Sequence, residues 1–270
     1  MIFLFLLWAH PGEEPVPAPF HQALQVDAET RALPMGRLVT TLGRRFLGTP
    51  YVAGTLDGHG EEHLVLTAEG LDCFTFVEVT LALAATVKQG GDDAAFRAAL
   101  TRLRYRGGVL DGYASRLHYT SEWGADNAAK GLLRDVTAAV GGSVYDKTIN
   151  FMGTHRDAYP ALADDAVYAR ILAMEQSLQG RTLYQVPEAE LTAAAAHIEE
   201  GDVLAITTTV PGLDVVHVGF AVFAQDGSLH LLHAGSVRGA VEVMPEPLVD
   251  YLTRSKSRQG VMVFRPIAPE

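Results

Sequence analysis

Apolar residues in the segment 64–87 follow the spacing of a helix. After position 73 they recur at intervals of three and four residues, as Phe74, Val77, Leu81 and Ala84. This is the pattern of a helix that buries apolar side chains along one face. Gly70 interrupts the chain just before the pattern, and Asp72 is a residue type that caps helix N-termini. We therefore predict a helix whose first turn contains residue 73.

A different periodicity between residues 201 and 236 predicts an antiparallel β-meander. An apolar segment at 203–208 ends at a Pro-Gly turn, apolar residues then alternate along 216–222, and a third strand follows at 229–234 after an Asp-Gly pair. On the second strand His217 shares a face with Gly219, which leaves room for another group. The third strand carries His233.

The turn between these strands decides whether the two histidines meet, because side chains alternate between the faces of a sheet. A two-residue turn would pair His217 with Ser236 and place His233 on the opposite face. A three-residue loop at 225–227, with its glycine left-handed, pairs His217 with Gly235 instead. His233 then becomes a diagonal neighbour on the same face. We predict the three-residue loop.

Cys73 is the only cysteine, so it forms no disulfide within the chain. Unpaired N–H groups and the dipole at a helix N-terminus favour thiolate over thiol, which predicts a nucleophile. The alternative interpretation is an inert cysteine packed as a small apolar residue. A nucleophilic thiol needs a base that later protonates the leaving amine, and histidine suits both tasks.

Several histidines can be set aside as that base on local grounds. His10 lies in the expected N-terminal leader and His21 directly follows it, and His230 is expected to be exposed. The spacing of His59 and His63 resembles that of a zinc pair, but neighbouring glycines disrupt the helix that would align them. We predict no metal site, and the two strand histidines remain the candidates.

The chain has 270 residues, 48% of them apolar, which is enough for one large core. We expect residues 21–270 to form a single domain and residues 1–20 to form a leader. Its apolar run at 2–8 is too short to span a bilayer, which takes about 20 residues. It resembles a signal peptide without the usual basic start, so we expect export to the periplasm or envelope, with a cytoplasmic protein as the alternative.

A formal net charge of −11 with scattered basic residues argues against nucleic acid as a partner. A small ligand of neutral or mixed charge fits better, and we expect a monomer. The sequence contains neither a phosphate-binding glycine loop after a strand nor a Gly-x-Ser-x-Gly elbow, and we predict no cofactor.

Several motifs together resemble the NlpC-type branch of the papain-like cysteine peptidases. They are Gly48-Thr49-Pro50-Tyr51, Asp72-Cys73, His217-Val218-Gly219-Phe220 and Leu232-His233-Ala234. A closer resemblance, over residues 35–266, is to the N-acetylmuramoyl-L-alanine amidase-like family. Its blocks are similar to residues 71–78, 116–123 and 147–152 of this chain.

The resemblance implies an α+β fold with a papain-like (NlpC-type) core, in which a nucleophile helix packs on an antiparallel β-sheet. It implies Cys73 as nucleophile, His217 as general base and His233 as the residue that orients the base. It also implies that Tyr51 lines the cleft near the scissile bond and that backbone N–H groups at residue 73 stabilise an oxyanion. Peptidoglycan fragments (muropeptides) are the implied partner.

Residues 88–200 exceed a minimal domain of this type and predict a large helical and loop insertion. Helical patterns occur at 92–103 and 166–179, and the segment 107–160 between them is predicted to be rich in loops. Aromatic and polar groups mixed in such a segment are typical of a ligand-binding wall. The predicted substrate contacts are Tyr51, Asp72, Tyr119, Glu122, Trp123, Asn150, Phe151, His155 and Ser236.

Three functions remain open from the sequence. The first is a cell-wall hydrolase that cleaves the MurNAc–L-Ala amide bond, with a D-glutamyl–diamino acid bond as the alternative. The second uses the same residues for acyl transfer or for hydrolysis of another amide or thioester. The third is an inactive wall-binding module, against which the intact cysteine and histidines argue.

Overall fold

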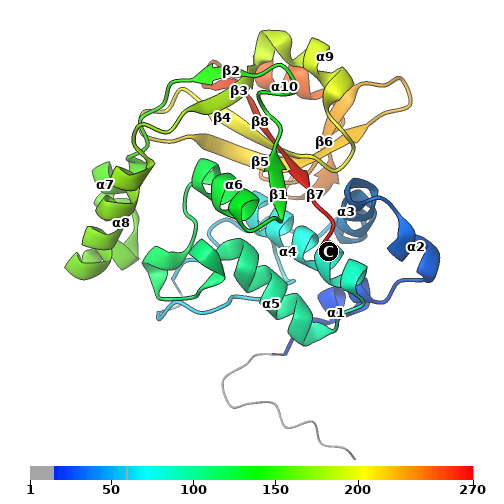
Figure 1. Cartoon of the computed structure of the whole chain (residues 1–270), viewed down its shortest axis with the longest axis horizontal. Helices are drawn as coiled ribbons and strands as arrows, with labels where there is room; N and C mark the ends of the chain where they lie inside the picture. Colours follow the sequence, from blue (N-terminus) through cyan, green and yellow to red (C-terminus); the bar gives the residue numbers. More distant parts are fainter. Residues whose placement is uncertain (1–14, 59, 270) are drawn as a thin grey trace, which may run out of the picture.

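The computed structural model describes residues 15–58 and 60–269. It is a mixed α and β structure in which helices cover an antiparallel sheet, as the predicted α+β class requires (Figure 1). The helices are α1 (Ala18–Leu24), α2 (Ala28–Ala32), α3 (Met35–Gly43), α4 (Cys73–Gln89), α5 (Asp93–Arg104), α6 (Thr120–Ala129), α7 (Phe151–Thr154), α8 (Asp165–Leu178), α9 (Leu191–Ala194) and α10 (Leu248–Thr253). The strands are β1 (Leu133–Asp135), β2 (Ser143–Tyr145), β3 (Leu183–Pro187), β4 (Val203–Thr208), β5 (Val215–Phe223), β6 (Leu229–Gly235), β7 (Ala240–Val243) and β8 (Arg258–Pro266).

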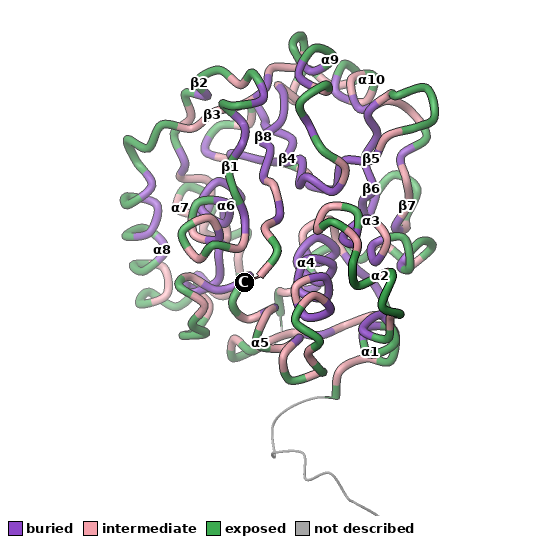
Figure 2. Tube along the Cα trace, turned by 45° about the vertical axis from the view of Figure 1, so that its right-hand side comes forward, coloured by how far each residue is buried: buried purple, intermediate pink, exposed green. Residues whose placement is uncertain are grey.

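The strands form one sheet in the order β2-β3-β8-β4-β5-β6-β7, and β1 also pairs with β8. Alternate residues of β4 point to opposite faces, so Val203 and Ala205 join one core while Leu204 and Ile206 join another. The first core lies between the sheet and helices α1, α3, α4 and α5, and the second lies under α9 and α10 (Figure 2). Both faces of the central strands are therefore buried.

Helix α4 begins at the predicted residue because its N-terminus is doubly capped. The backbone N–H of Thr75 donates to Oδ1 of Asp72 at 2.7 Å, and the backbone N–H of Asp72 donates to Oγ1 of Thr75 at 2.9 Å. This reciprocal pair is a capping box. Gly90 ends the helix in the left-handed conformation, with φ of 67°. The cap fixes Cys73 as the first helical residue.

The hairpin between β5 and β6 has the predicted three-residue loop. Ala224 and Ser228 are still joined by a backbone hydrogen bond, which leaves residues 225–227 as the loop, and Gly227 has φ of 83°. Phe220 pairs with Leu232. Continuing this register sets His217 opposite Gly235, so the prediction of an odd loop is confirmed.

Three expectations from the sequence need correction. Phe20 is fully buried between the rings of Phe46 and Phe96, so the folded domain includes part of the predicted leader 1–20. The loop-rich segment contains helix α6, which has no side-chain cap and little apolar periodicity to mark it. His230 is buried rather than exposed, and it hydrogen-bonds to the carbonyl of Met244.

The apolar run at 2–8 lies outside the described residues, so the predicted signal segment stays a prediction. Among the residues that the structure does describe, no helix is long and apolar enough to cross a bilayer. The predicted helices of the insertion are present as α5 and α8, which begin at Asp93 and Asp165.

Candidate active site

The predicted nucleophile lies where helix α4 meets strand β5. Cys73 is partly buried, and the backbone N–H of Val218 hydrogen-bonds to its sulfur. Val218 directly follows His217 in β5, so the thiol and the predicted base come from adjoining parts of the structure. The fold thus brings together two residues that are far apart in the sequence.

Burial raises the pKa of the Cys73 thiol to about 12, and the carboxylate of Asp72 acts in the same direction. The backbone N–H groups of Val218, Cys73 and Phe74 oppose this shift by hydrogen bonding to the sulfur. The expected effect of the helix N-terminus is therefore present, but desolvation outweighs it. The prediction of a resting thiolate is wrong, and the group is a neutral thiol near neutral pH.

The two strand histidines form a direct pair. Nε2 of His217 lies 2.6 Å from Nδ1 of His233, and the rings are perpendicular with centroids 4.8 Å apart. Since His217 uses Nε2 in this bond, its Nδ1 remains to accept a proton from a thiol. In that arrangement Nε2 of His217 donates to Nδ1 of His233, which fixes the tautomers of both rings.

Burial keeps both rings neutral. Desolvation lowers the pKa of His217 to about 3, and repulsion from a protonated His233 and from Arg258 acts in the same direction. Desolvation lowers the pKa of His233 to about 4. Near neutral pH the thiol and the two imidazoles are therefore all uncharged, and burial disfavours the protonated form of each ring.

No hydrogen bond joins Cys73 to either imidazole within the described part of the chain, because the sulfur is bonded to the strand backbone instead. Catalytic hydrogen bonds are often long or poorly aligned without substrate and tighten when it binds. Proton transfer from Cys73 to His217 thus requires a side-chain adjustment at this junction.

Three of the predicted substrate contacts lie beside these groups. Tyr51 lies next to the nucleophile, since burial and the neighbouring Cys73 and Asp72 raise the pKa of its phenol. Asp72 lines a cavity of about 220 Å³ together with Phe74. Ser236 is exposed and lines a different cavity of about 320 Å³ with both histidines.

Three others have partners inside the protein. The hydroxyl of Tyr119 donates to Oε1 of Glu175 at 2.7 Å, and Glu122 is buried against Nε of Arg106 at the same distance. Trp123 is fully buried. The structure argues against substrate contact for Glu122 and Trp123, because both side chains are buried in the protein. Tyr119 still borders the cavity that Asp72 lines.

The remaining predicted contacts lie around helix α7. Asn150 precedes the helix, and its backbone N–H donates to the carbonyl of Gly212 at 3.0 Å. The ring of Phe151 stacks on His155 at 4.0 Å, and His155 is exposed. None of these three borders the cavities described here, so their contact with substrate stays a prediction.

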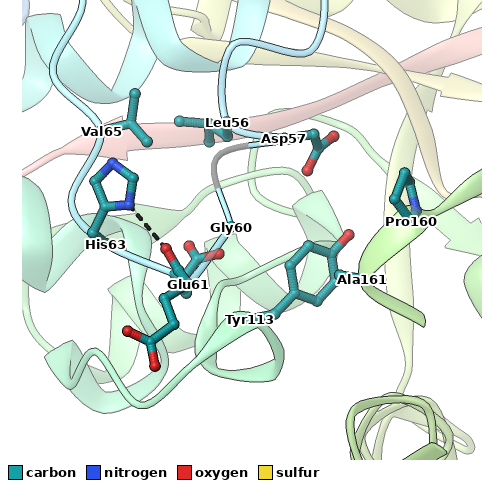
Figure 3. A pocket seen from close by; sticks show the side chains of 11 residues that line it. Leu56, Asp57, Gly60, Glu61, His63, Val65, Tyr113, Pro160 and Ala161 are labelled. Carbon is teal, nitrogen blue, oxygen red and sulfur yellow. Dashed lines mark hydrogen bonds between the residues drawn. The ribbon is translucent and has the colours of Figure 1, made fainter. Parts of the chain in front are cut away.

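A third cavity adjoins the one at Asp72. It measures about 320 Å³ and shares Leu56, Asp57 and Tyr113 with it (Figure 3). Sequence reasoning did not single out Asp57 or Tyr113, because neither lies in a motif near the nucleophile. The aromatic residue within the loop-rich segment was the available signal for Tyr113.

This third cavity is also lined by His63, whose Nδ1 lies 2.9 Å from the carbonyl oxygen of Glu61 (Figure 3). His59, the other member of the rejected zinc pair, lies outside the described residues. Within the described ranges, no group of three or more His, Cys, Asp and Glu side chains is arranged to hold a metal ion.

Sequence and structural comparisons agree on the class of protein. The sequence model of the family described as AmiA-like, N-acetylmuramoyl-L-alanine amidase-like, matches residues 41–261. An N-acetylmuramoyl-L-alanine amidase from Bacteroides uniformis is 38% identical, with a TM-score of 0.82 over 86% of this chain and 99% of that one. The class is therefore that of amidase-like hydrolases.

A Bacteroides fragilis protein described as a candidate xylanase is 39% identical, with a TM-score of 0.78 over 83% of this chain and 98% of that one. A Legionella pneumophila protein, 21% identical with a TM-score of 0.66 over 92% of this chain and 95% of that one, shares the fold. No curated protein matches the chain. The family match covers more than half of the sequence, and the chain belongs to the N-acetylmuramoyl-L-alanine amidase-like family.

Proposed function

We propose that the protein is a cysteine amidase that hydrolyses an amide bond of muropeptides, the MurNAc–L-Ala bond first among them. One observation carries the proposal: the sulfur of Cys73 lies at the backbone of Val218, next to a base that is already hydrogen-bonded to His233. Membership of the amidase-like family supports peptidoglycan as the substrate. An amide bond in that polymer is what such a nucleophile and base would cleave.

The reaction begins with a neutral thiol. As Sγ of Cys73 attacks the carbonyl carbon, the thiol proton passes to Nδ1 of His217, a C–S bond forms, and the carbonyl electron pair moves to oxygen. The backbone N–H groups of Cys73 and Phe74, which hydrogen-bond to the sulfur before the reaction, turn to the oxyanion as it forms and stabilise it. The proton then passes to the leaving amine, the C–N bond breaks, and water deprotonated by His217 hydrolyses the thioester.

His233 serves this cycle as a positioning residue. Its Nδ1 accepts from Nε2 of His217 at 2.6 Å, which holds the base in the tautomer that leaves Nδ1 free. When His217 becomes protonated, that hydrogen bond is to a charged donor and strengthens. The pair therefore compensates for the low basicity that burial gives His217.

We further propose that the core is of the papain-like NlpC type. The order of the functional residues supports this placement: a cysteine begins a helix, and histidines follow on two consecutive antiparallel strands. Glycoside hydrolysis, as in a xylanase, uses two carboxylates that flank the scissile bond. A thiol and two imidazoles are suited to acyl chemistry instead.

Defined muropeptides test the proposal. Incubation of the protein with a disaccharide tetrapeptide, followed by mass spectrometry, is expected to give free disaccharide and free tetrapeptide, and the Cys73→Ala variant is expected to give neither. Cleavage after D-glutamate would assign the endopeptidase reaction instead. Added amines that appear in the product would reveal acyl transfer. If the protein cleaves no bond in any muropeptide, the proposal is rejected.

We propose that the enzyme acts outside the cytoplasmic membrane, because its proposed substrate lies there. Cell fractionation with an antibody to the folded domain tests this location. Recovery of the full-length chain in the cytoplasm alone would contradict it.

A further inference from the structure

His233 has a second ring nitrogen that the mechanism leaves unused. Its Nε2 is buried and has no hydrogen-bond partner in the described structure. If Nδ1 accepts the proton of His217, Nε2 must carry the hydrogen of the neutral ring. A buried donor without an acceptor is costly and calls for an explanation.

A carboxylate lies directly across the sheet from this nitrogen. β6 pairs with β7 so that His233 is opposite Glu242, and Oε1 of Glu242 is 3.9 Å from Nε2 of His233. An N–H···O hydrogen bond measures about 2.7–3.2 Å, so a shift of about 1 Å would close it. The other oxygen, Oε2, forms an ion pair with Nε of Arg238 at a distance of 2.9 Å, which favours a position of the carboxylate near the ring.

Gly235, two residues after His233 in β6, has no side chain and leaves space for this approach. A Cβ on Gly235 would lie 2.9 Å from Cε1 of His233 and 3.1 Å from Oε1 of Glu242. Any larger residue at 235 would therefore occupy the place where ring and carboxylate meet. Both groups also line the cavity of about 320 Å³ that contains Ser236, so the carboxylate has room to move.

We propose that Glu242 is a positioning residue of the active site, accepting a hydrogen bond from Nε2 of His233 and so extending the relay from Cys73 through His217 and His233. This inference rests on the proposed function for its catalytic meaning. A carboxylate at the far end of the relay stabilises positive charge as the thiol proton reaches His217, much as an acidic residue supports the base of a hydrolase triad.

Other charged groups face the same cavity and must be separated from this effect. They are Arg238 and Glu246 from the loops beside β7, Arg254 directly after α10, and Arg258 at the start of β8. Oε1 of Glu246 accepts from Nη1 of Arg254 at 2.6 Å. Glu246 is thus a carboxylate of the same cavity with its own arginine, and Glu246→Gln is the matched control.

Three substitutions at position 242 divide the role into parts. Glu242→Gln keeps an acceptor and removes the charge, Glu242→Leu removes both, and Glu242→Asp restores the charge on a shorter side chain. We expect kcat on a defined muropeptide to fall about tenfold in Glu242→Gln and further, towards a hundredfold, in Glu242→Leu. KM is expected to stay within about twofold, and Glu242→Asp is expected to recover part of kcat.

A measurement without substrate keeps this inference separate from the proposed function. The ¹⁵N chemical shifts of the imidazoles are expected to show Nε2 of His233 as a protonated, hydrogen-bonded nitrogen in the wild type and to change in Glu242→Leu but not in Glu246→Gln. Thermal unfolding verifies that each variant is folded. Unchanged His233 shifts in Glu242→Leu would overturn the inference, whether or not muropeptides are cleaved. Altered shifts without muropeptide cleavage would reject the proposed function and leave the contact established.

Discussion

A Cβ on Gly219 would lie 2.9 Å from Cβ of His233 and 2.8 Å from the carbonyl oxygen of Leu232. The sequence predicted that this glycine leaves room beside His217, and the group that uses the room is the second histidine. The spacing of the histidine pair thus depends on the absence of one side chain. Because the carbonyl oxygen of Leu232 belongs to the backbone of β6, it cannot move away from an added methyl group as a flexible side chain does.

Gly219→Ala is therefore expected to impair both the fold and the site. Overpacking of this kind costs about 1–3 kcal/mol of unfolding free energy, and displacement of His233 lowers kcat in the protein that remains folded. Gly124→Ala is the control, because its Cβ would meet the ring of Phe264 at 2.2 Å in another part of the core. Urea unfolding and kcat measured on both variants decide the matter. Equal kcat in the two would contradict the expectation.

Acid is expected to destabilise the protein through its buried histidines. Burial lowers the pKa of His118 to about 3, of His217 to about 3 and of His233 to about 4. Unfolded histidine titrates near about 6.5, so below that pH the unfolded chain binds more protons than the folded one. The stability that these neutral rings contribute is complete above pH 6.5 and is lost as the pH falls towards 4 and then 3.

The loss between pH 7.5 and 5 is on the order of 1–2 kcal/mol for each buried histidine. Urea unfolding at the two pH values measures it. His118→Gln, which removes one of these groups and leaves the pair of His217 and His233 intact, is expected to reduce the pH dependence. His155→Gln at an exposed position serves as the control. An identical pH dependence in His118→Gln and wild type would show that His118 does not contribute.

The ion pair beneath the nucleophile helix is expected to be costly to break. Nε of Arg104 in α5 donates to Oε2 of Glu78 in α4 at 2.7 Å, and the two side chains are 2% and 1% exposed. Desolvation raises the pKa of Glu78, against the opposing charge of Arg104. Removing one partner of a buried pair costs about 3–5 kcal/mol, because the other charge is left unpaired.

Arg104→Met alone is therefore expected to destabilise more than the double variant Glu78→Leu with Arg104→Met. A double-mutant cycle from urea unfolding measures the coupling between the two side chains. If the losses of unfolding free energy in the two single variants add up to the loss in the double variant, the two charges do not stabilise each other. Arg102→Met on the same helix, at a largely exposed position, controls for the change of side chain.

The three-residue loop at 225–227 is expected to be essential for activity, although it lies at the surface. Replacing it with a two-residue Asn-Gly turn changes the pairing by one residue and turns His233 to the other face of the sheet. We expect kcat to fall at least about a hundredfold, as when a triad partner is lost. Gly227→Asn, which keeps the loop length and tolerates positive φ, is expected to retain activity. Near-normal activity of the shortened loop would contradict this register.

The elements around the site were predictable where local signals are strong. The cap at Asp72 and the strands β4, β5 and β6 follow from residue types and periodicity, and the register of β5 with β6 follows from loop chemistry. Strand β8, which lies at the centre of the sheet, was not predicted. Its position between β3 and β4 depends on contacts between distant parts of the chain, which no local pattern records.

The chemistry of the site was predictable only in part. Sequence reasoning paired His217 with His233, but it assigned a thiolate to Cys73 because it counted the helix dipole and not the cost of burial. Trp123 was taken for a ligand contact because an aromatic residue in a polar segment suits a binding wall and a core equally well. Burial at a single position depends on tertiary packing, and the residue type does not reveal it.

The central place of β8 limits the order in which the sheet can assemble. On the ribosome, Cys73 and the strand that carries His217 are synthesised well before residues 258–266, yet β4 has no neighbour on one side until those residues arrive. The pairing of β4 with β8 can thus form only after residues 258–266 have been made. Until residues 258–266 have been synthesised, β4 therefore has only β5 beside it, and the sheet that carries His217 and His233 lacks one of its central strands.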